Sequence, residues 1–326
     1  MQRIKKYNNI KNMKKTSLGT LVLLPFLFLC CKTPPIQKVL PTINNNTVFT
    51  KSGKTLRIYF AQFYDEQGKV FNGDGTVIKL PDDKVMVIDG FVSEAAEQYV
   101  EFIKSLGITK IDYLIATHYH GDHIGGFPAI IENFEIGTLY TNDAPISNIA
   151  TAELNKITEE KEITPQVLKK GDHLDLCEEC YADIIWPDLT EKEKYDAMYN
   201  PGRTEKKINC TSLVTKITYK DFSIIFPGDI YHSVEKQLVE EYGDQLKATI
   251  LKAAHHGEWY TANYLLFVQT VSPDYGVIQD NRYITSRISN IYKKAGSKIL
   301  YRLTPGYMLI ESNGIDYTIS ETSYTN

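Results

Sequence analysis

The chain has 326 residues, of which 43% are hydrophobic and 23% charged, the balance of a soluble globular protein with one large domain or two small ones. It contains no internal repeat and no long low-complexity span, which excludes repeat architectures. Its 36 basic and 40 acidic residues give a net charge of −4.

Residues 1–31 predict an export signal and not a part of the fold. Six basic residues and no acidic one precede an apolar run from Leu18 to Leu29, which is too short for a comfortable membrane span. Cys30 and Cys31 follow directly, which resembles a bacterial lipoprotein signal with Cys31, or less favourably Cys30, as the acylated residue. An ordinary cleaved signal and an uncleaved anchor are the alternatives.

Removal of residues 1–31 would change the charge of the chain. It would leave 30 basic and 40 acidic residues, a net charge of −10, because the segment carries six basic residues and no acidic one. Such a surface disfavours sequence-independent binding of nucleic acid, without excluding a local basic groove. Residues 32–54 contain several prolines and three consecutive asparagines and predict a tether, which leaves 55–326 as the domain. We expect an exported protein of the bacterial cell envelope, lipid-anchored or otherwise secreted, and predict no protein partner.

The first half of the domain begins with strands and continues with helices and strands in alternation. Apolar and alternating runs predict strands over residues 57–63, 76–80, 84–88, 111–116 and 139–140. Helical spacing predicts helices over residues 93–106, 127–133 and 147–170. The first of these helices is expected to be capped by Ser93 and to stop at Gly107.

The second half follows a similar order. Strands are predicted within 174–187 and over 212–219, 222–226, 250–254, 275–279, 298–302, 306–311 and 315–319. Helices are predicted over 231–242, 261–270 and 284–295, and a charged irregular loop over 188–208. Two similar blocks suit two sheets packed face to face with helices outside. Cys177 and Cys180 are interpreted as a surface turn, disulfide-bonded or free.

Metal-type side chains are concentrated directly after the strand predicted at 111–116. Three histidines and one aspartate fall within six residues, namely His118, His120, Asp122 and His123, and Gly125-Gly126 follow. Only seven histidines occur in the chain, so this density is not expected of an ordinary polar loop. Neutral imidazole and carboxylate together suit zinc, and also manganese or iron, so the loop is predicted to bind metal.

Two later strands also end in residues of this kind. One ends in Phe226-Pro227-Gly228-Asp229 and the other in His255-His256-Gly257. Loops at strand ends are a usual place for chemistry on a rigid scaffold, so we expect these residues to share one rim with the first loop. Adjacent side chains at a strand end point in opposite directions, so only one of His255 and His256 is expected to bind metal.

The pattern His-x-His-x-Asp-His, together with the Gly-Asp and the closing histidine, resembles the metal motif of the metallo-β-lactamase superfamily. The resemblance covers about residues 55–320 and implies an α/β fold, a four-layer αββα sandwich of two mixed sheets flanked by helices. It implies a metal-one site with His118 and His120, a metal-two site with Asp122, His123 and His255, and Asp229 as the bridge. It also implies that Asp122 orients the nucleophile, that His256 touches substrate or acts as an acid, and that Asp89 buttresses the loop.

The chain departs from many superfamily members at the third histidine of metal one. Pro201-Gly202-Arg203-Thr204 carries an arginine at the corresponding place, so metal one is expected to be weaker, completed by water or absent. Asn209-x-x-Ser212 there resembles the hydrolase domain of bacterial competence DNA-uptake channel proteins, which implies that Asn209 and Ser212 contact a phosphate or a metal-bound water. The many membrane helices of those channels have no counterpart, so we expect a stand-alone relative. Arg282, in a loop after a predicted strand, suits phosphate binding.

The leading hypothesis is therefore a metal-dependent phosphodiesterase that uses one or two zinc ions, with manganese as the alternative metal. Its substrate would be nucleic acid or a phosphoryl-decorated surface polymer, and its lipid anchor would attach it to the bacterial membrane. Hydrolysis of a lactone or β-lactam is a second hypothesis, weakened by the missing histidine. A non-catalytic metal-containing lipoprotein is a third, disfavoured because Asp122, Asp229 and His255 are intact.

Overall fold

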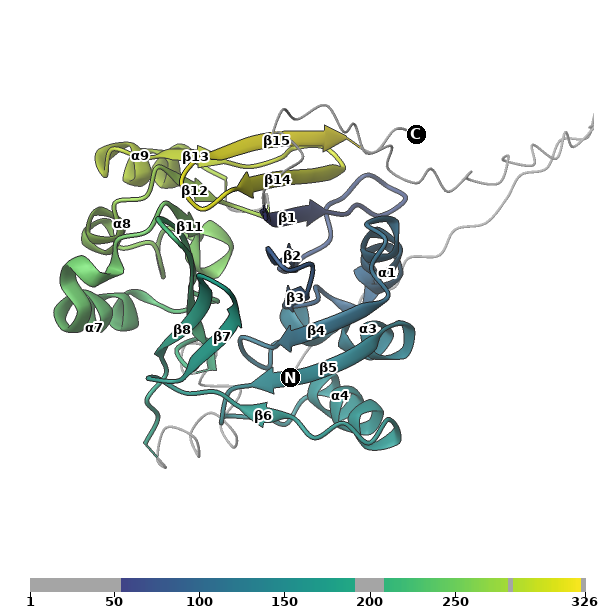
Figure 1. Cartoon of the computed structure of the whole chain (residues 1–326). Helices are drawn as coiled ribbons and strands as arrows, with labels where there is room; N and C mark the ends of the chain where they lie inside the picture. The colour runs from purple at the N-terminus through teal and green to yellow at the C-terminus, as the bar shows by residue number, and fades with distance from the viewer. Residues whose placement is uncertain (1–53, 191–207, 281–283, 324–326) are drawn as a thin grey trace, which may run out of the picture. The chain divides into compact units, whose positions relative to one another are not determined.

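The computed structural model describes residues 54–190, 208–280 and 284–323. Within them, two mixed β-sheets pack face to face between two layers of helices, which confirms the predicted four-layer sandwich (Figure 1). The predicted signal, most of the tether and Cys31 lie outside the described residues. In the described part of the chain, no helix combines the length and the apolar character needed to cross a membrane.

The first sheet has eight strands in the order β15-β14-β1-β2-β3-β4-β5-β6. Its antiparallel strands are β15 (Tyr317–Ser323), β14 (Gly306–Ser312), β1 (Leu56–Gln62), β2 (Thr76–Lys79) and β3 (Val85–Ile88). The strands β4 (Lys110–Ile115), β5 (Glu135–Thr141) and β6 (Gln166–Val167) then continue the sheet parallel to β3. Because β2 is antiparallel to β3, the start of β2 shares one edge with the carboxyl ends of β3 and β4.

The second sheet has seven strands in the order β13-β12-β11-β10-β9-β8-β7. Its antiparallel strands are β7 (His173–Cys177), β8 (Cys180–Trp186), β9 (Val214–Tyr219) and β10 (Phe222–Phe226). The strands β11 (Ile250–Lys252), β12 (Tyr275–Val277) and β13 (Lys298–Leu300) are parallel to β10. The carboxyl ends of β10, β11 and β12 therefore form a second edge from which loops emerge together.

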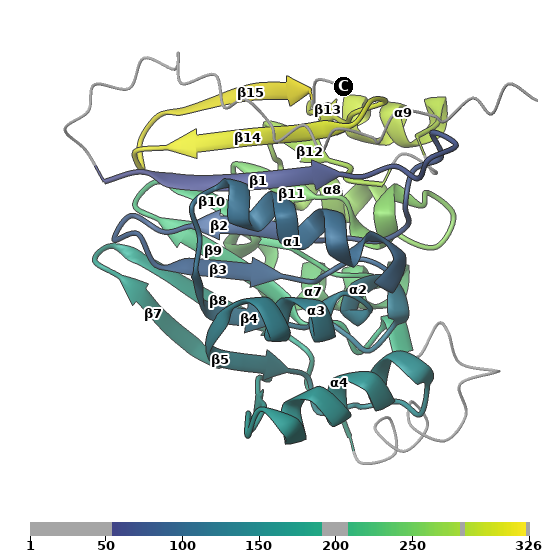
Figure 2. The same cartoon turned by 90° about the vertical axis from the view of Figure 1, so that its right-hand side faces the viewer.

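Helices cover the outer face of each sheet. The first sheet carries α1 (Ala96–Ser105), α3 (Phe127–Asn133) and α4 (Ile149–Glu160), which lie in front of it in Figure 2. The second sheet carries α7 (His232–Tyr242), α8 (Leu265–Val271) and α9 (Ser286–Lys294) (Figure 1). Short helical segments within the described residues include η1 (Ser93–Ala95), α2 (Gly121–Ile124) and η3 (Gly243–Leu246), and a further turn, η4 (Ala254–Gly257), carries the two adjacent histidines.

Three apolar clusters correspond to the three interfaces between the four layers. One lies between the sheets and combines side chains such as Ile58 and Met86 with Ile217 and Ile224. A second joins the first sheet to its helices and a third joins the second sheet to α7, α8 and α9. Burial of these faces, at about 25 cal/mol per Å² of apolar surface, is the main force that stacks the layers.

Most predicted elements form, with local differences at their ends. The helix predicted over 147–170 ends at Glu160, because Glu162 adopts φ 55° and Pro165 restricts the residue before it; Gln166 and Val167 then join the first sheet. Ser93 does not cap the following helix, since it lies inside η1 and its hydroxyl donates to Glu94.

Candidate metal centre

The loop after β4 brings four of the predicted residues to one rim of the sandwich. His118 and His123 are fully buried, while His120 and Asp122 are partly exposed. The short helix α2 begins directly after His120 and carries Asp122 and His123. The ring atoms His118 Nε2 and His120 Nδ1 lie 3.0 Å apart, so these two imidazoles point toward the same place.

Asp89, at the carboxyl end of β3, holds this loop as expected. Its Oδ1 accepts a hydrogen bond from the backbone N–H of Thr117, and its Oδ2 accepts one from the hydroxyl of Thr117, both at 2.8 Å. The same Oδ2 lies 2.8 Å from Nδ1 of His123. An imidazole whose Nδ1–H is bound to a carboxylate presents Nε2 to a metal, which is the usual arrangement around protein-bound metals.

Asp229, after β10, lies at the centre of the cluster. Its Oδ2 is 3.2 Å from His123 Nε2, 3.4 Å from His256 Nε2 and 3.8 Å from His118 Nε2. Its Oδ1 is buried and has no hydrogen-bond partner among the described residues. One carboxylate thus faces histidines from both sheets, which is the position expected of a bridging ligand.

His255 and His256 lie in the turn η4 with left-handed backbone angles, φ 48° and 55°. Nε2 of His256 is 3.3 Å from Asp122 Oδ2, in addition to its approach to Asp229. Nε2 of His255 is 3.9 Å from Asp229, and its Nδ1 is 2.9 Å from Glu258. We predicted His255 as the metal ligand and His256 as the residue near substrate, whereas the geometry favours the opposite assignment.

Two overlapping groups could hold metal. Asp74, His123, Asp229 and His256 offer atoms within 4.8 Å of one another, and so do His118, His120 and Asp229. Tetrahedral zinc with bonds of about 2.0–2.1 Å places neighbouring ligand atoms about 3.3 Å apart. The separations of 3.0–3.8 Å between facing ligand atoms are therefore suitable for metal.

Burial and neighbouring charges shift the pKa values of these donors in different directions. Burial and the adjacent rings of His123 and His120 hold the pKa of His118 well below its usual value, which keeps its lone pair available. Burial opposes charge on His123 and His256, but facing carboxylates, above all Asp229, outweigh it and raise the pKa of both rings. Burial likewise disfavours the ionised form of Asp229, yet His256 and His123 hold its pKa well below the usual range. Without metal, the protonated rings compensate the buried carboxylates.

Asn209 and Ser212, predicted to contact substrate, both lie beside this cluster. The Ser212 hydroxyl is fully buried, donates to the Asn209 carbonyl at 2.8 Å and accepts from the backbone N–H of Asp229 at 3.1 Å. These contacts make Ser212 a support for Asp229. Nδ2 of Asn209 lies 3.2 Å from His255 Nε2, and its buried Oδ1 finds no hydrogen-bond partner in the described ranges. Arg282 lies outside the described residues.

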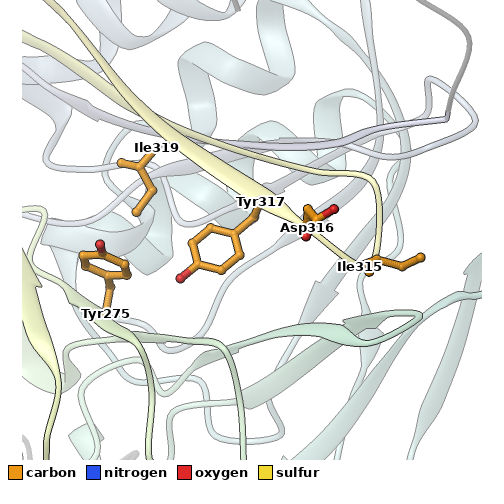
Figure 3. A pocket seen from close by; sticks show the side chains of 5 residues that line it. All are labelled: Tyr275, Ile315, Asp316, Tyr317 and Ile319. Atoms are coloured by element: carbon orange, nitrogen blue, oxygen red, sulfur yellow. The ribbon is translucent and has the colours of Figure 1, made fainter. Parts of the chain in front are cut away.

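Other features predicted or found lie away from the metal cluster. A cavity of about 490 Å³, lined by Tyr275 and Tyr317 among others, opens where β12 begins, at the edge opposite the histidines (Figure 3). Cys177 and Cys180 lie opposite each other in the register of β7 and β8, on either side of the connecting turn, and no disulfide joins them. His173 lies on the exposed face of β7 beside Asp183.

Sequence reasoning missed two buried residues at the centre. The composition of Asn72-Gly73-Asp74-Gly75 predicts only a turn, yet Asp74 lies against His256. Lys252, the last residue of β11, forms a buried ion pair with Asp74. A lysine in an otherwise apolar run next to a histidine pair was the one available signal, because a charge there needs a partner.

Comparisons with known proteins agree with this geometry. A model of the metallo-β-lactamase superfamily matches residues 68–266. Competence protein ComA of Neisseria gonorrhoeae is 22% identical over 235 residues, which are 70% of this chain and 29% of that protein. ComE operon protein 3 of Bacillus subtilis is 24% identical over 187 residues, 56% of this chain and 22% of that protein. The chain thus spans less than a third of the length of either relative.

A diphosphatase from the PhnP family is 11% identical, with a TM-score of 0.45, covering 79% of this chain and 98% of that chain. The expected resemblance to competence proteins is confirmed by the two sequence matches. Because the family model covers more than half of the chain, and the histidines and aspartates of the motif converge at one rim, the chain belongs to the metallo-β-lactamase superfamily of metal-dependent hydrolases.

Proposed function

We propose that this protein is a phosphodiesterase with two divalent cations, zinc in the first place and manganese as the alternative. The observation that carries the proposal is that one buried carboxylate, Asp229, belongs to both groups of metal-type residues. A carboxylate shared in this way is typical of paired-metal sites that hydrolyse phosphoesters.

The ligands divide between the two cations. His118 and His120 would hold the first, Asp122, His123 and His256 would hold the second, and Asp229 would be shared by both. When bound, the pair of cations supplies Lewis acidity toward a phosphoryl oxygen and lowers the pKa of a water.

His255 replaces His256 as the residue proposed to act on substrate. Its Nδ1 lies beside the Glu258 carboxylate, which orients the ring and leaves Nε2 near Asn209 and Asp229. A ring held in this way can exchange a proton with a substrate oxygen at Nε2. Asn209, at hydrogen-bonding distance from that nitrogen, helps to keep it in place.

A phosphodiester is favoured over an acyl substrate for two reasons. The curated relatives are competence proteins, which suits nucleic acid or another phosphodiester polymer. In addition, Asn209 and Ser212 stand in the region of the sequence where lactone and β-lactam hydrolases commonly supply a third histidine to the first metal. The expected net charge of −10 for the exported chain favours a short nucleic acid or a phosphoryl-decorated surface polymer over long DNA.

Metal analysis combined with a phosphodiesterase assay tests this function. We expect about two metals per chain and hydrolysis of bis-p-nitrophenyl phosphate, with at least about a 100-fold loss of activity in Asp229→Ala and His120→Ala. His173→Ala, which removes an exposed histidine away from the centre, serves as the matched control and should retain activity. One metal with activity would contradict the paired site, and metal with hydrolysis only of a lactone or β-lactam would contradict the substrate class.

We also propose that the chain is exported and anchored in the bacterial envelope through a lipid on Cys31. The support is the basic segment, the apolar run and the cysteine that follows it. Cells that express the full chain with labelled palmitate should label the parent protein and Cys30→Ala, but not Cys31→Ala. Equal labelling of all three proteins would contradict acylation at Cys31.

A further inference from the structure

A second buried carboxylate lies beside the metal centre, against His256. It belongs to Asp74, in the loop that leads into β2. Asp74 Oδ1 lies 3.3 Å from Nδ1 of His256, while Nε2 of the same ring faces Asp122 and Asp229. Asp74 therefore approaches the ring at Nδ1, and it also offers an atom within 4.8 Å of those that His123 and Asp229 offer.

The other oxygen of Asp74 is engaged by a cation. Oδ2 lies 2.7 Å from Nζ of Lys252, and the side chains of Asp74 and Lys252 are only 8% and 5% exposed. Lys252 ends β11, four residues before His256. This buried ion pair joins the loop before β2 to the end of β11, which leads into the histidine turn. It therefore connects the first sheet to the second beside the metal centre.

The backbone around Asp74 fits tightly against the metal loop. Its N–H donates to the carbonyl of Asp122 at 3.2 Å, and its carbonyl accepts from the N–H of Phe91 at 2.9 Å. Gly73 has φ +105°, and a side chain there would meet the Asp122 carbonyl. Asp74 is thus fixed by both its backbone and its side chain and has little freedom to move toward a ligand position.

The arrangement resembles the support of the neighbouring histidine, with a longer contact. Asp89 Oδ2 lies at hydrogen-bonding distance, 2.8 Å, from Nδ1 of His123, whereas Asp74 Oδ1 forms an ion-pair contact of 3.3 Å with Nδ1 of His256 that lacks hydrogen-bond geometry. The residues that flank these carboxylates, at the start of β2 and the end of β3, are paired in the sheet through Thr76 and Ile88. Two adjacent, antiparallel strand ends of the first sheet therefore supply one supporting carboxylate for each of the two imidazoles beside Asp229.

We propose that Asp74 and Lys252 form a positioning pair that fixes the orientation of His256, so that its Nε2 faces the second metal, and that Asp74 is not itself a ligand. Lys252 holds the Asp74 carboxylate close to Nδ1 of His256 and compensates the negative charge of that carboxylate. The inference rests on the metal centre of the proposed function but not on the identity of the substrate. It adds two residues to those that the metal motif supplies.

Metal affinity, measured by competition with a coloured chelator, tests the pair independently of hydrolysis. Asp74→Asn should weaken the affinity for zinc about 10–100-fold, as is usual when a supporting carboxylate is lost. Lys252→Met should lower the melting temperature of the metal-free protein by about 5–10 °C, because it leaves Asp74 buried without its cation. Asp82→Asn, the same chemical change in an ion pair at the other end of β2, is the matched control and should leave zinc affinity unchanged.

The double variant Asp74→Asn/Lys252→Met separates positioning from folding. With both charges removed, the melting temperature of the metal-free protein should recover relative to Lys252→Met, while zinc affinity should stay 10–100-fold weaker than in the parent. Zinc affinity within about twofold of the parent in this variant would show that Asp74 serves folding alone and would overturn the proposal.

The visible spectrum of the cobalt-substituted protein distinguishes support from direct ligation. If Asp74 supports His256, cobalt-loaded Asp74→Asn should show the parent's band positions and metal stoichiometry at saturation. A changed coordination spectrum would make Asp74 a direct ligand and overturn the proposal, as would a parent protein that binds no metal. A parent that binds metal but hydrolyses no phosphodiester would contradict the proposed function and leave this test intact.

Discussion

Nε2 of His256 lies 3.4 Å from Oδ2 of Asp229, although the two residues follow different strands of the second sheet. His255, its neighbour in sequence, lies farther from the same oxygen and interacts with Glu258. The turn η4 therefore places two identical side chains in different surroundings, and the roles proposed for them can be tested.

Separate alanine substitutions should divide metal binding from turnover. His256→Ala should lose about one metal per chain, because it removes a ligand of the second metal. His255→Ala should keep the parent's metal content while kcat falls about 100-fold or more, as expected when a proton-transfer residue is removed. Elemental analysis and steady-state kinetics on the same preparations check both outcomes, and metal loss in His255→Ala alone would reverse the assignment.

The stability of the metal-free protein should depend on pH in a defined direction. Burial opposes charge on His123 and His256, but the facing carboxylates outweigh it and raise the pKa of both rings above the unfolded value. The stability that these two protonated rings contribute to the fold is therefore complete below about pH 6.5 and is lost as the pH rises. The lowered pKa of Asp229 acts oppositely, so its stabilisation is present above about pH 4 and is lost in acid. The lowered pKa of His118 also costs stability below about pH 6.5, because the unfolded ring binds a proton there and the folded ring does not. Melting of chelator-treated protein should therefore be highest near pH 6.5.

Metal should reverse that trend on the alkaline side. Bound metal replaces protons on His123 and His256, so the increase in melting temperature on adding zinc should be larger at pH 8 than at pH 6. Parallel melting curves with and without zinc measure the increase. An equal increase at both values would show that these rings do not exchange protons for metal.

Gly73→Ala should disturb the centre from outside it. A Cβ atom at Gly73 would collide with the carbonyl of Asp122, and the φ of +105° is unfavourable for any side chain. We expect a loss of more than about 2 kcal/mol in the free energy of unfolding, together with weaker metal binding. Gly68→Ala is the matched control, because Gly68 also has a positive φ of +75° but has open space around it, and should cost about 1–2 kcal/mol without affecting metal. Equal effects of the two substitutions would show that backbone strain alone, and not the contact with Asp122, is responsible.

Ser212→Ala should act through Asp229. The serine hydroxyl accepts from the N–H of Asp229 and donates to the carbonyl of Asn209, all within a buried region. Its removal leaves two buried backbone groups without this partner, which should cost about 1–3 kcal/mol of stability. If Ser212 is a support and not a substrate contact, kcat should fall more than KM changes. A large rise in KM at constant kcat would restore its predicted role in substrate binding.

The sandwich was predictable because its strands and helices have strong, regular apolar patterns. The run from Ile111 to Ala116 and the helix over 127–133 were placed almost to the residue. The convergence of Asp229 with the histidine loop was also predictable in outline, since all these residues follow apolar strands. Short strands such as β6, with only Gln166 and Val167, carry no pattern from which they could be identified.

The assignment of the adjacent histidines depended on geometry that no sequence pattern encodes. The argument from alternation assumed an extended strand end, whereas both residues adopt left-handed angles that are uncommon outside glycine, asparagine and aspartate. Asp74 was hidden for a related reason, because the turn-type composition of residues 72–75 gave no indication that β2 begins beside the histidine turn after β11. Contacts between segments nearly 180 positions apart come from the packing of the two sheets.

The donor atoms of the centre are divided between the two halves of the chain. His118, His120, Asp122 and His123 come from the first sheet, and Asp229 and His256 come from the second. Neither half of the chain contains all of these donor residues. Tight metal binding therefore has to follow the docking of one half against the other during folding. Metal uptake by refolding protein would then report the moment at which the two halves meet, and a bound ion would slow their separation.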